Sequence, residues 1–267
     1  MSKNNSINFQ DIRKVVIKVG TSTLTHKTGM INIRKIENIV KVLSDLQNSG
    51  KEIILVSSGA VSAGFAKLGE SNEDRTLEEK QAAAAVGQCE LMNMYDRLFS
   101  LYGHTVAQIL ITKDAVDNEE RRQNVRNTFR SLINRRCIPI VNENDSVSFE
   151  GIKFGGNDTL SAYVAMLTDA ELLINMSDID GLFDKNPREF PDARLIPVVG
   201  EVDAAIKSCA GGAGSSRGTG GMIKKIEAAE IVTSTGIPMI IINGASPDIL
   251  YKVFEGDFIG TIFTAHR

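Results

Sequence analysis

With 267 residues, 42% of them hydrophobic and 24% charged, the chain has the composition of an ordinary soluble globular protein with a substantial core. Its formal net charge of −3 argues against a general nucleic-acid or anionic-membrane surface, so we expect neither partner. Three widely spaced cysteines and three scattered histidines favour no disulfide framework, zinc site or histidine-based triad, and we expect buried free thiols in a reducing cytosol. Neither a signal-peptide core nor an apolar run of membrane-spanning length is present, which predicts a cytoplasmic protein.

Apolar runs of strand length alternate with helical patterns along the chain. The pattern predicts strands at 15–19, 52–56, 105–110, 138–141, 171–175, 239–242 and 261–263. It predicts helices at 32–49, 61–68, 77–101 with an interruption at Gly87, 118–134, from about 158, 202–208, 223–235 and 248–254. Segment 184–197 contains three prolines and is expected to lack long regular structure. This alternation predicts an α/β fold, with a mainly parallel sheet covered by helices on both faces.

Lys18 interrupts the otherwise apolar strand 15–19. Burying an ammonium group without a partner is costly. Either this is an edge strand with Lys18 in solvent, or Lys18 projects near the strand end toward a phosphate, beside backbone amides exposed by Gly20. The pattern alone leaves both interpretations open. The next strand likewise ends in Ser57-Ser58-Gly59-Ala60 before a helix, which is an arrangement that suits anions but is common in α/β proteins.

Short polar side chains gather between the strand at 138–141 and the helix near 158. Asn142, Asn144, Asp145, Asn157 and Asp158 flank the pair at 155–156, which is Gly-Gly. Turn closure and helix capping explain Asn157 or Asp158. They do not require five such residues on both flanks, and functional groups favour loops at the carboxyl ends of strands. The cluster therefore predicts a binding or catalytic site.

A glycine-rich stretch at 210–222 leads into a helix with Lys224 and Lys225 in its predicted first turn. A mobile linker is one interpretation. Phosphate contact is favoured because the helix dipole would otherwise disfavour lysines there. Neither the Walker A pattern nor a G-x-G-x-x-G after a strand is met. The arginines at 121, 122, 126 and 130 predict a solvated face or a subunit contact.

In a doubly wound sheet these strand ends and helix starts can converge on one edge. The converging groups are two lysines, many backbone amides and one well-placed carboxylate, without a histidine or cysteine nucleophile. Such a set suits phosphoryl transfer, which needs charge neutralisation and alignment more than covalent catalysis.

Together the motifs resemble the glutamate 5-kinase family of the amino acid kinase superfamily. They follow the family's order, and the resemblance covers nearly the whole chain, from 15 to 263. The motifs are Lys18-Val19-Gly20-Thr21-Ser22, Ser57-Ser58-Gly59-Ala60, Asn142-Glu143-Asn144-Asp145, Asn157-Asp158-x-Leu160-Ser161-Ala162 and Gly218-Thr219-Gly220-Gly221-Met222-x-x-Lys225.

The resemblance implies the three-layer αβα amino acid kinase fold and ATP-dependent phosphorylation of the γ-carboxylate of L-glutamate, the first step of proline biosynthesis. Lys18 and Lys225 would contact the transferring phosphoryl group, and Asp158 would hold their ammonium groups in place. The resemblance also implies binding roles. Gly20 and Gly59 would offer amides to phosphoryl oxygens; the glutamate pocket would contain Ser58, Asp145, Asn157 and Asn142, with Asp145 facing the substrate ammonium. The nucleotide pocket would contain Ser177, Asp178, Thr219, Gly220, Gly221, Met222 and Lys225. Mg²⁺ would arrive with ATP rather than occupy a metal site of the protein.

The family also implies a single kinase domain over 1–267, with an amino-acid-binding lobe at about 10–168 and a nucleotide-binding lobe at 169–267. Many members carry a further C-terminal PUA domain, and we expect none here. Proline as feedback inhibitor and assembly into a homo-oligomer, a dimer or tetramer, are expected by analogy. One departure is Gly156, where the family often has an acidic residue directly before the Asn-Asp pair.

Two rival hypotheses remain at this stage. One is a sibling kinase acting on another carboxylate, carbamate or a nucleoside monophosphate. The other is a non-catalytic amino-acid or nucleotide sensor. The presence of Lys18, Lys225 and Asp158 together argues against a sensor, because a sensor has no need of groups that stabilise a transition state.

Overall fold

The computed structural model describes residues 7–148, 154–210 and 219–265. Its described residues form an eight-stranded sheet in the order β3-β4-β2-β1-β5-β7-β8-β6. Every described pair of neighbouring strands is parallel except β7 and β8, as predicted for a mainly parallel sheet. The strands are β1 (Lys14–Val19), β2 (Glu52–Ser57), β3 (Val106–Ile111), β4 (Ile138–Glu143), β5 (Leu172–Ser177), β6 (Val198–Val199), β7 (Met239–Asn243) and β8 (Gly260–Phe263).

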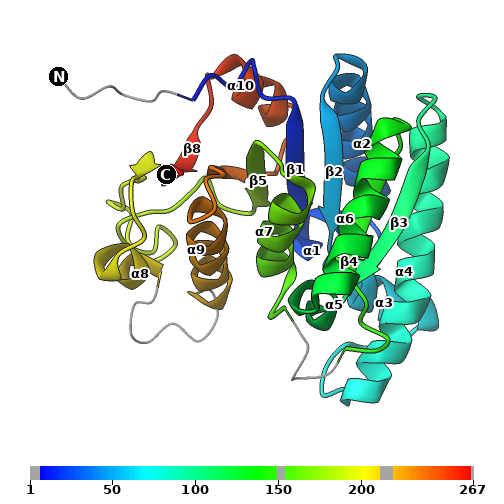
Figure 1. Ribbon diagram of the computed structural model, residues 1–267. Helices are drawn as coiled ribbons and strands as arrows, with labels where there is room; N and C mark the ends of the chain where they lie inside the picture. The colour runs from blue at the N-terminus through cyan, green and yellow to red at the C-terminus, as the bar shows by residue number, and fades with distance from the viewer. Residues whose placement is uncertain (1–6, 149–153, 211–218, 266–267) are drawn as a thin grey trace.

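Helices cover both faces of the sheet, which confirms the three-layer αβα architecture (Figure 1). One face carries α2 (Ile33–Asn48), α3 (Ala60–Leu68), α4 (Leu77–Ser100) and α10 (Ile249–Glu255). The other face carries α6 (Glu119–Asn134), α7 (Asn157–Thr168) and α9 (Thr219–Thr233). Three shorter helices are α1 (Thr21–Leu24), α5 (Lys113–Asp117) and α8 (Ala204–Ala210).

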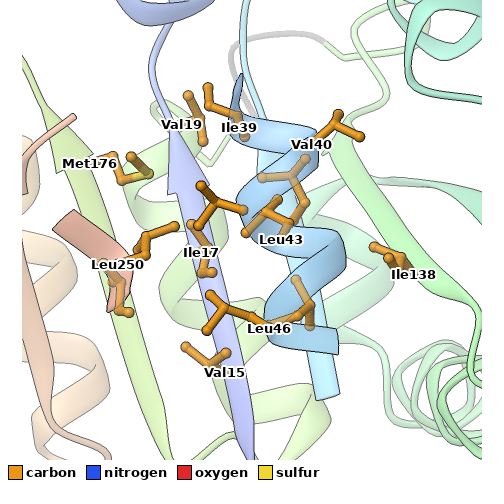
Figure 2. Packing of buried hydrophobic residues seen from close by; sticks show 14 of the residues in the cluster. Val15, Ile17, Val19, Ile39, Val40, Leu43, Leu46, Ile138, Met176 and Leu250 are labelled. Atoms are coloured by element: carbon orange, nitrogen blue, oxygen red, sulfur yellow. The ribbon is translucent and has the colours of Figure 1, made fainter. Parts of the chain in front are cut away.

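Side chains of the central strand β1 alternate between two hydrophobic cores. Val15, Ile17 and Val19 pack toward α2, as Figure 2 shows, whereas Val16 belongs to the core beneath α7 and α9. The same alternation directs Lys18 toward α7. The sequence thus places one lysine on the face covered by α6, α7 and α9.

The long helix α4 corrects one prediction, because it continues through Gly87 without interruption. A Cβ atom at Gly87 would lie 1.9 Å from the carbonyl oxygen of Ala60, and one at Gly64 would lie 1.7 Å from that of Ala83. Glycine at these positions lets α3 and α4 touch backbone to backbone. Gly87 is therefore a close-packing residue, and the cost of glycine inside a helix is outweighed by this contact.

Helix α9 corrects another prediction, because it begins at Thr219 rather than near 223. Lys224 and Lys225 consequently lie in its second turn. The field of a helix terminus falls off within the first turn, so the dipole argument that favoured phosphate contact by these lysines does not apply. The glycine-rich segment 211–218, which includes Gly218 of the motif, lies outside the described residues.

The cysteines are free thiols, as expected, but they are not buried. Cys89 is exposed, and Cys137 and Cys209 are half-buried. Cys89 lies on the side of α4 turned away from the sheet, where a small side chain meets solvent rather than the core. No described helix is both long and apolar enough to cross a membrane.

The arginine face of α6 is solvated. Arg121 pairs with Asp114, and Arg126 makes a bidentate pair with Asp169 at 2.8 Å to each carboxylate oxygen. Arg121 is exposed and Arg126 is half-buried beside an exposed Asp169, and pairs that face solvent contribute little to stability. Arg121 and Arg126 therefore each have an acidic partner within the chain.

Candidate active site

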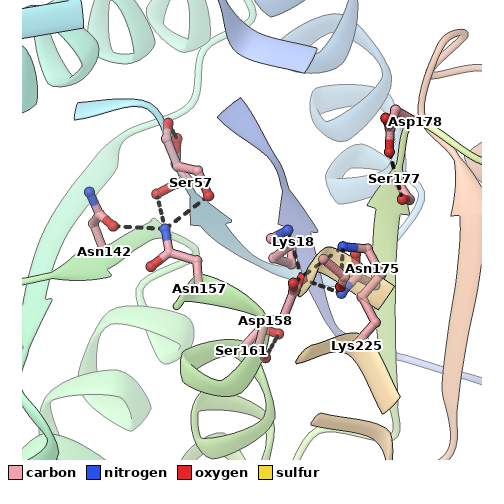
Figure 3. Close-up of polar contacts among 12 residues, drawn as sticks. Lys18, Ser57, Asn142, Asn157, Asp158, Ser161, Asn175, Ser177, Asp178 and Lys225 are labelled. Carbon is pink, nitrogen blue, oxygen red and sulfur yellow. Dashed lines mark hydrogen bonds and ion pairs between the residues drawn. The ribbon is translucent and has the colours of Figure 1, made fainter. Parts of the chain in front are cut away.

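Two lysines converge on one carboxylate at the centre of the sheet. Lys18 Nζ lies 2.7 Å from Asp158 Oδ1, and Lys225 Nζ lies 3.2 Å from Asp158 Oδ2 (Figure 3). The three residues come from β1, α7 and α9. Because β1 lies between β2 and β5 and Lys18 is only 6% exposed, the interpretation of Lys18 as a solvated edge residue is wrong. The structure brings together all three residues assigned to catalysis.

Asn175 completes this cluster and was missed by sequence reasoning. It lies on β5 directly beside Lys18 in the parallel register, so both side chains face α7. Its Nδ2 donates a hydrogen bond of 2.6 Å to Asp158 Oδ1. Its Oδ1 is buried without a hydrogen-bond partner among the described residues. The available signal was the same as for Lys18, a polar residue within an otherwise apolar strand.

Electrostatics keep Asp158 ionised. Burial acts to raise the pKa of its carboxyl group, but the ammonium groups of Lys18 and Lys225 and the hydrogen bonds from Lys18 and Asn175 outweigh burial and lower that pKa. Burial is the largest influence on Lys18 and lowers its pKa; Lys225 acts in the same direction, whereas Asp158 opposes them. When both lysines are protonated, two positive charges share one negative charge, so the cluster favours an additional anion.

Neither Asn157 nor Asp158 caps α7 with its side chain, which corrects the capping interpretation. The N-cap residue is Gly156, at φ 129°, and it makes no side-chain cap in the described structure. Asn157 instead directs its Nδ2 into the neighbouring loops. This atom lies 3.0 Å from Ser57 O, 3.0 Å from Ser58 Oγ and 2.9 Å from Asn142 Oδ1. Ser58, Asn142 and Asn157, three of the four residues assigned to glutamate binding, are therefore held together by one amide.

The loop after β4 lies beside this amide. Asn142 and Glu143 end β4, and Asp145 follows in the turn before Ser148. The buried carboxylate of Glu143 accepts hydrogen bonds from Ser148 Oγ at 3.1 Å and from the backbone N–H of Phe154 at 3.3 Å. Glu143 thus ties together both ends of the segment that precedes α7. The residues between them, 149–153, lie outside the described part of the chain.

A pocket opens on the other side of the lysine cluster. Its walls come from the end of β5, from the segment that follows β5 and from the start of α9. They include Ser177, Asp178, Gly221, Met222 and Lys225 of the predicted nucleotide set, together with Arg188, Cys209 and Ala210. Arg188 donates a hydrogen bond of 2.6 Å to Asp178 Oδ2 at this pocket. Thr219 and Gly220 begin α9.

The two glycines assigned to phosphate contact lie at loop positions next to the cluster. Gly20 precedes α1, and a Cβ atom there would lie 3.6 Å from Lys18 Nζ. Gly59 precedes α3 at φ 102°, a backbone conformation that glycine adopts readily. Both positions leave the backbone open to close approach by a ligand.

No cluster of three or more His, Cys, Asp or Glu side chains suited to a metal ion occurs within residues 7–148, 154–210 and 219–265. The oxygens of Asp158 are engaged by Lys18, Lys225 and Asn175.

Comparison with known proteins identifies the family. The family model described as the amino acid kinase family matches residues 13–243. The chain belongs to this family. The chain is also 49% identical to the glutamate 5-kinase of Clostridium perfringens, over 97% of this chain and 98% of that one, and 51% identical to that of Clostridium tetani, over 99% of each chain. The glutamate 5-kinase of Moorella thermoacetica is 51% identical over 94% of this chain and 66% of its own length.

Solved structures with much lower sequence identity share the fold. UMP kinase from Ureaplasma parvum has a TM-score of 0.65 at 12% identity, covering 95% of this chain and 99% of that chain. The isopentenyl phosphate kinase of T. acidophilum has a TM-score of 0.66 at 20% identity, covering 94% of this chain and 99% of that chain. At such identities the likeness supports the amino acid kinase fold and not a substrate.

Proposed function

We propose that this amino acid kinase transfers the γ-phosphoryl group of ATP to the γ-carboxylate of L-glutamate, forming L-glutamyl 5-phosphate at the start of proline biosynthesis. The observation that carries the proposal is the buried Lys18–Asp158–Lys225 cluster, which lies between the Asn157 network and the Ser177–Asp178 pocket. The relatives that share about half of its residues are named glutamate 5-kinases.

The chemistry needs no general base. The side-chain carboxyl group of free glutamate has an ordinary pKa of about 4.3 and is already a nucleophile at neutral pH. One of its oxygens attacks the γ-phosphorus of ATP, the bond to the β–γ bridging oxygen breaks, and ADP leaves with that oxygen. Lys18 and Lys225 stabilise the charge on the transferring group, and Asp158 fixes the position of both ammonium groups.

Glutamate binds on the side of the cluster formed by Ser58, Asn142, Asp145 and Asn157. The carboxylate of Asp145 accepts a hydrogen bond from the substrate ammonium group, because its negative charge matches the positive charge of that group. The amide of Asn157, held by Ser57, Ser58 and Asn142, orients the pocket. The open backbone at Gly20 and Gly59 allows the phosphoryl oxygens to approach main-chain amides.

ATP binds in the pocket lined by Ser177, Asp178 and the start of α9, where Thr219, Gly220, Gly221 and Met222 precede Lys225. Mg²⁺ accompanies ATP on its phosphate oxygens, where it neutralises charge and orients the phosphates. Asp158 remains the partner of the lysines.

Three wider expectations belong to the same proposal. Residues 10–168 form the amino-acid-binding lobe and 169–267 the nucleotide-binding lobe, in keeping with a sheet whose strands β1–β4 and β5–β8 come from the two parts. Proline inhibits by competing for the glutamate pocket, and the cytoplasmic protein assembles as a homo-dimer or tetramer. Inhibition kinetics with proline at varied glutamate concentrations test the inhibition. Light scattering after size-exclusion chromatography tests the oligomeric state.

The decisive experiment measures ATP-dependent acyl phosphate formation by trapping with hydroxylamine. L-glutamate, L-aspartate, acetylglutamate and carbamate are compared as acceptors. We expect turnover with glutamate alone, and turnover that falls by orders of magnitude in Asp158→Asn with a modest change in substrate KM. Turnover with a different acceptor would overturn the substrate assignment. Binding of ATP or glutamate without any turnover would favour a sensor.

A further inference from the structure

Helix α4 carries three polar side chains at intervals of seven residues, Gln81, Gln88 and Tyr95. Residues seven apart on an α-helix differ by only about 20° in direction, so the three share one face. With a rise of 1.5 Å per residue, neighbouring members stand about 10 Å apart along the axis. We name these three residues the α4 stripe.

Gln88, in the middle of the stripe, contacts the glutamate side of the candidate active site. Its Oε1 accepts a hydrogen bond of 2.9 Å from Asn142 Nδ2. The Oδ1 of Asn142 in turn accepts a hydrogen bond of 2.9 Å from Asn157 Nδ2, which also lies 3.0 Å from Ser58 Oγ. Because Gln88 engages the Nδ2 of Asn142, it fixes which way the Asn142 amide faces. The carbonyl oxygen is then the atom presented to Asn157.

The outer members of the stripe contact the two neighbouring loops. Gln81 Nε2 donates a hydrogen bond of 2.8 Å to the carbonyl oxygen of Ser148, at the end of the turn that contains Asp145. The hydroxyl group of Tyr95 shares a hydrogen bond of 2.9 Å with that of Ser57. Burial raises the pKa of Tyr95 to about 12, although the bond to Ser57 opposes this, so the hydroxyl group stays neutral.

Two features fix the position of α4 relative to the neighbouring loops. Its first turn has a complete capping box between Thr76 and Glu79. Gly87 lies in backbone contact with Ala60, the first residue of α3. Since Ala60 follows directly on the Ser57–Gly59 loop, α4 is fixed against one of the loops that the stripe contacts.

We propose that the α4 stripe is a positioning element for the amino acid pocket, setting affinity for glutamate, and not affinity for ATP, through Ser57 at the end of β2, Asn142 at the end of β4 and the turn that ends at Ser148. This inference rests on the proposed function, because it concerns the glutamate side of that same site. None of the three side chains is assigned contact with the reacting atoms. Gln88 acts most directly because it orients Asn142 of the pocket, whereas Gln81 and Tyr95 act through Ser148 and Ser57, which lie on the same segments as pocket residues.

The test compares Gln88→Met, Gln81→Leu and Tyr95→Phe with the wild type in the hydroxamate assay. Gln88→Met keeps the length of the side chain and removes the acceptor. We expect it to raise the KM for glutamate about tenfold, as for the loss of one hydrogen bond that leaves a part-buried donor unpaired. The KM for ATP should stay within about twofold, and kcat should change less than the KM for glutamate. Gln81→Leu and Tyr95→Phe should also raise the KM for glutamate without raising the KM for ATP, but by a smaller factor than Gln88→Met.

Asn93→Met provides the matched control, because Asn93 lies exposed on the opposite side of α4. It should leave both KM values unchanged. A wild type that forms no hydroxamate from glutamate would overturn the proposed function and this inference together. An active wild type with an unchanged KM for glutamate in all three variants would overturn only the inference. Equal increases in the KM for glutamate and the KM for ATP, together with a lower melting temperature, would also overturn the inference, because a purely structural role predicts that result. If Gln88→Met does not fold, Tyr95→Phe, which removes one oxygen atom, carries the test by the same criteria.

Discussion

Replacing Asn175 by leucine separates its contribution to stability from its contribution to catalysis. The side chain is fully buried on β5 and donates one short hydrogen bond to the ionised Asp158. Hydrogen bonds to charged groups contribute about 1.5–3 kcal/mol to stability. The same substitution removes Oδ1, a buried acceptor without a partner among the described residues, and such a group costs about 1–3 kcal/mol. The two effects nearly cancel, so we expect the free energy of unfolding at neutral pH to change by about 1 kcal/mol or less.

Turnover should respond much more strongly. Asp158 loses one of its donors, and the positions of Lys18 and Lys225 become less restricted. Small displacements of groups that align a transferring phosphoryl group reduce rates severely, and we expect kcat to fall about tenfold with little change in either KM. Urea denaturation and the hydroxamate assay measure the two quantities on the same samples. Asn93→Leu makes the same chemical change at an exposed position and should alter neither.

The pH dependence sharpens this prediction. The lowered pKa of Asp158 gives a stabilising contribution that is present above the pKa of the unfolded state and is lost as pH falls through the folded-state pKa. Loss of the Asn175 hydrogen bond raises the folded-state pKa in the variant. The contribution is then smaller at neutral pH and disappears at a higher pH than in the wild type. As the pH is lowered, the wild type loses the larger Asp158 contribution, while the gain from removing the unpaired Oδ1 persists, so the difference in unfolding free energy should shift in favour of the variant. A large loss of stability with unchanged kcat, or a difference independent of pH, would refute the reasoning.

Three other substitutions test the remaining assignments. Lys225→Met should lower kcat by at least about a thousandfold, because the lost charge acts on the transition state. Calorimetry should find glutamate affinity largely retained. Retained turnover would exclude a role for Lys225 in stabilising the transition state. Asp145→Ala should raise the KM for glutamate more than it lowers kcat, and a defect in kcat alone would argue against contact with the substrate ammonium group. Gly87→Ala should destabilise the fold by about 1–3 kcal/mol or more in urea denaturation, because its Cβ would overlap Ala60 O. The control Ala85→Gly, on the exposed side of the same helix, should cost only about 1 kcal/mol.

The sequence predicted the layers of the fold because they depend on local signals, whereas the grouping of Lys18, Asp158 and Lys225 in one site came from the resemblance to a family. Hydrophobic periodicity located the long helices and the strands of the sheet. Glycine and short polar residues located the loops at the strand ends. Whether Lys18 was buried or solvated could not be read locally, since that depends on the neighbours of β1 in the sheet. Only the position of β1 between β2 and β5 excludes the edge interpretation.

Contacts between distant segments explain what the sequence did not reveal. Gln88 and Asn142 are 54 residues apart, and Asp158 and Asn175 are 17 apart, so no spacing rule connects them. Gly87 was interpreted as a break because glycine disfavours helices, whereas its actual role is set by the backbone of α3. In each case a residue with weak intrinsic preference is specified by a partner that only the folded chain supplies.

The buried cluster combines residues from both halves of the sheet and holds two ammonium groups against one carboxylate. Lys18 comes from the central strand, Asp158 from the last helix before β5, and Lys225 from the segment between β5 and β7. Burial and the neighbouring Lys225 lower the pKa of Lys18, and the carboxylates of Asp158 and Asp178 oppose this only in part, so the charged form of Lys18 is disfavoured. A phosphoryl group placed against both ammonium groups adds negative charge and favours the charged form of Lys18 again. Anion binding and protonation of Lys18 therefore support each other, and the positive charge is strongest when the group to be transferred is in place.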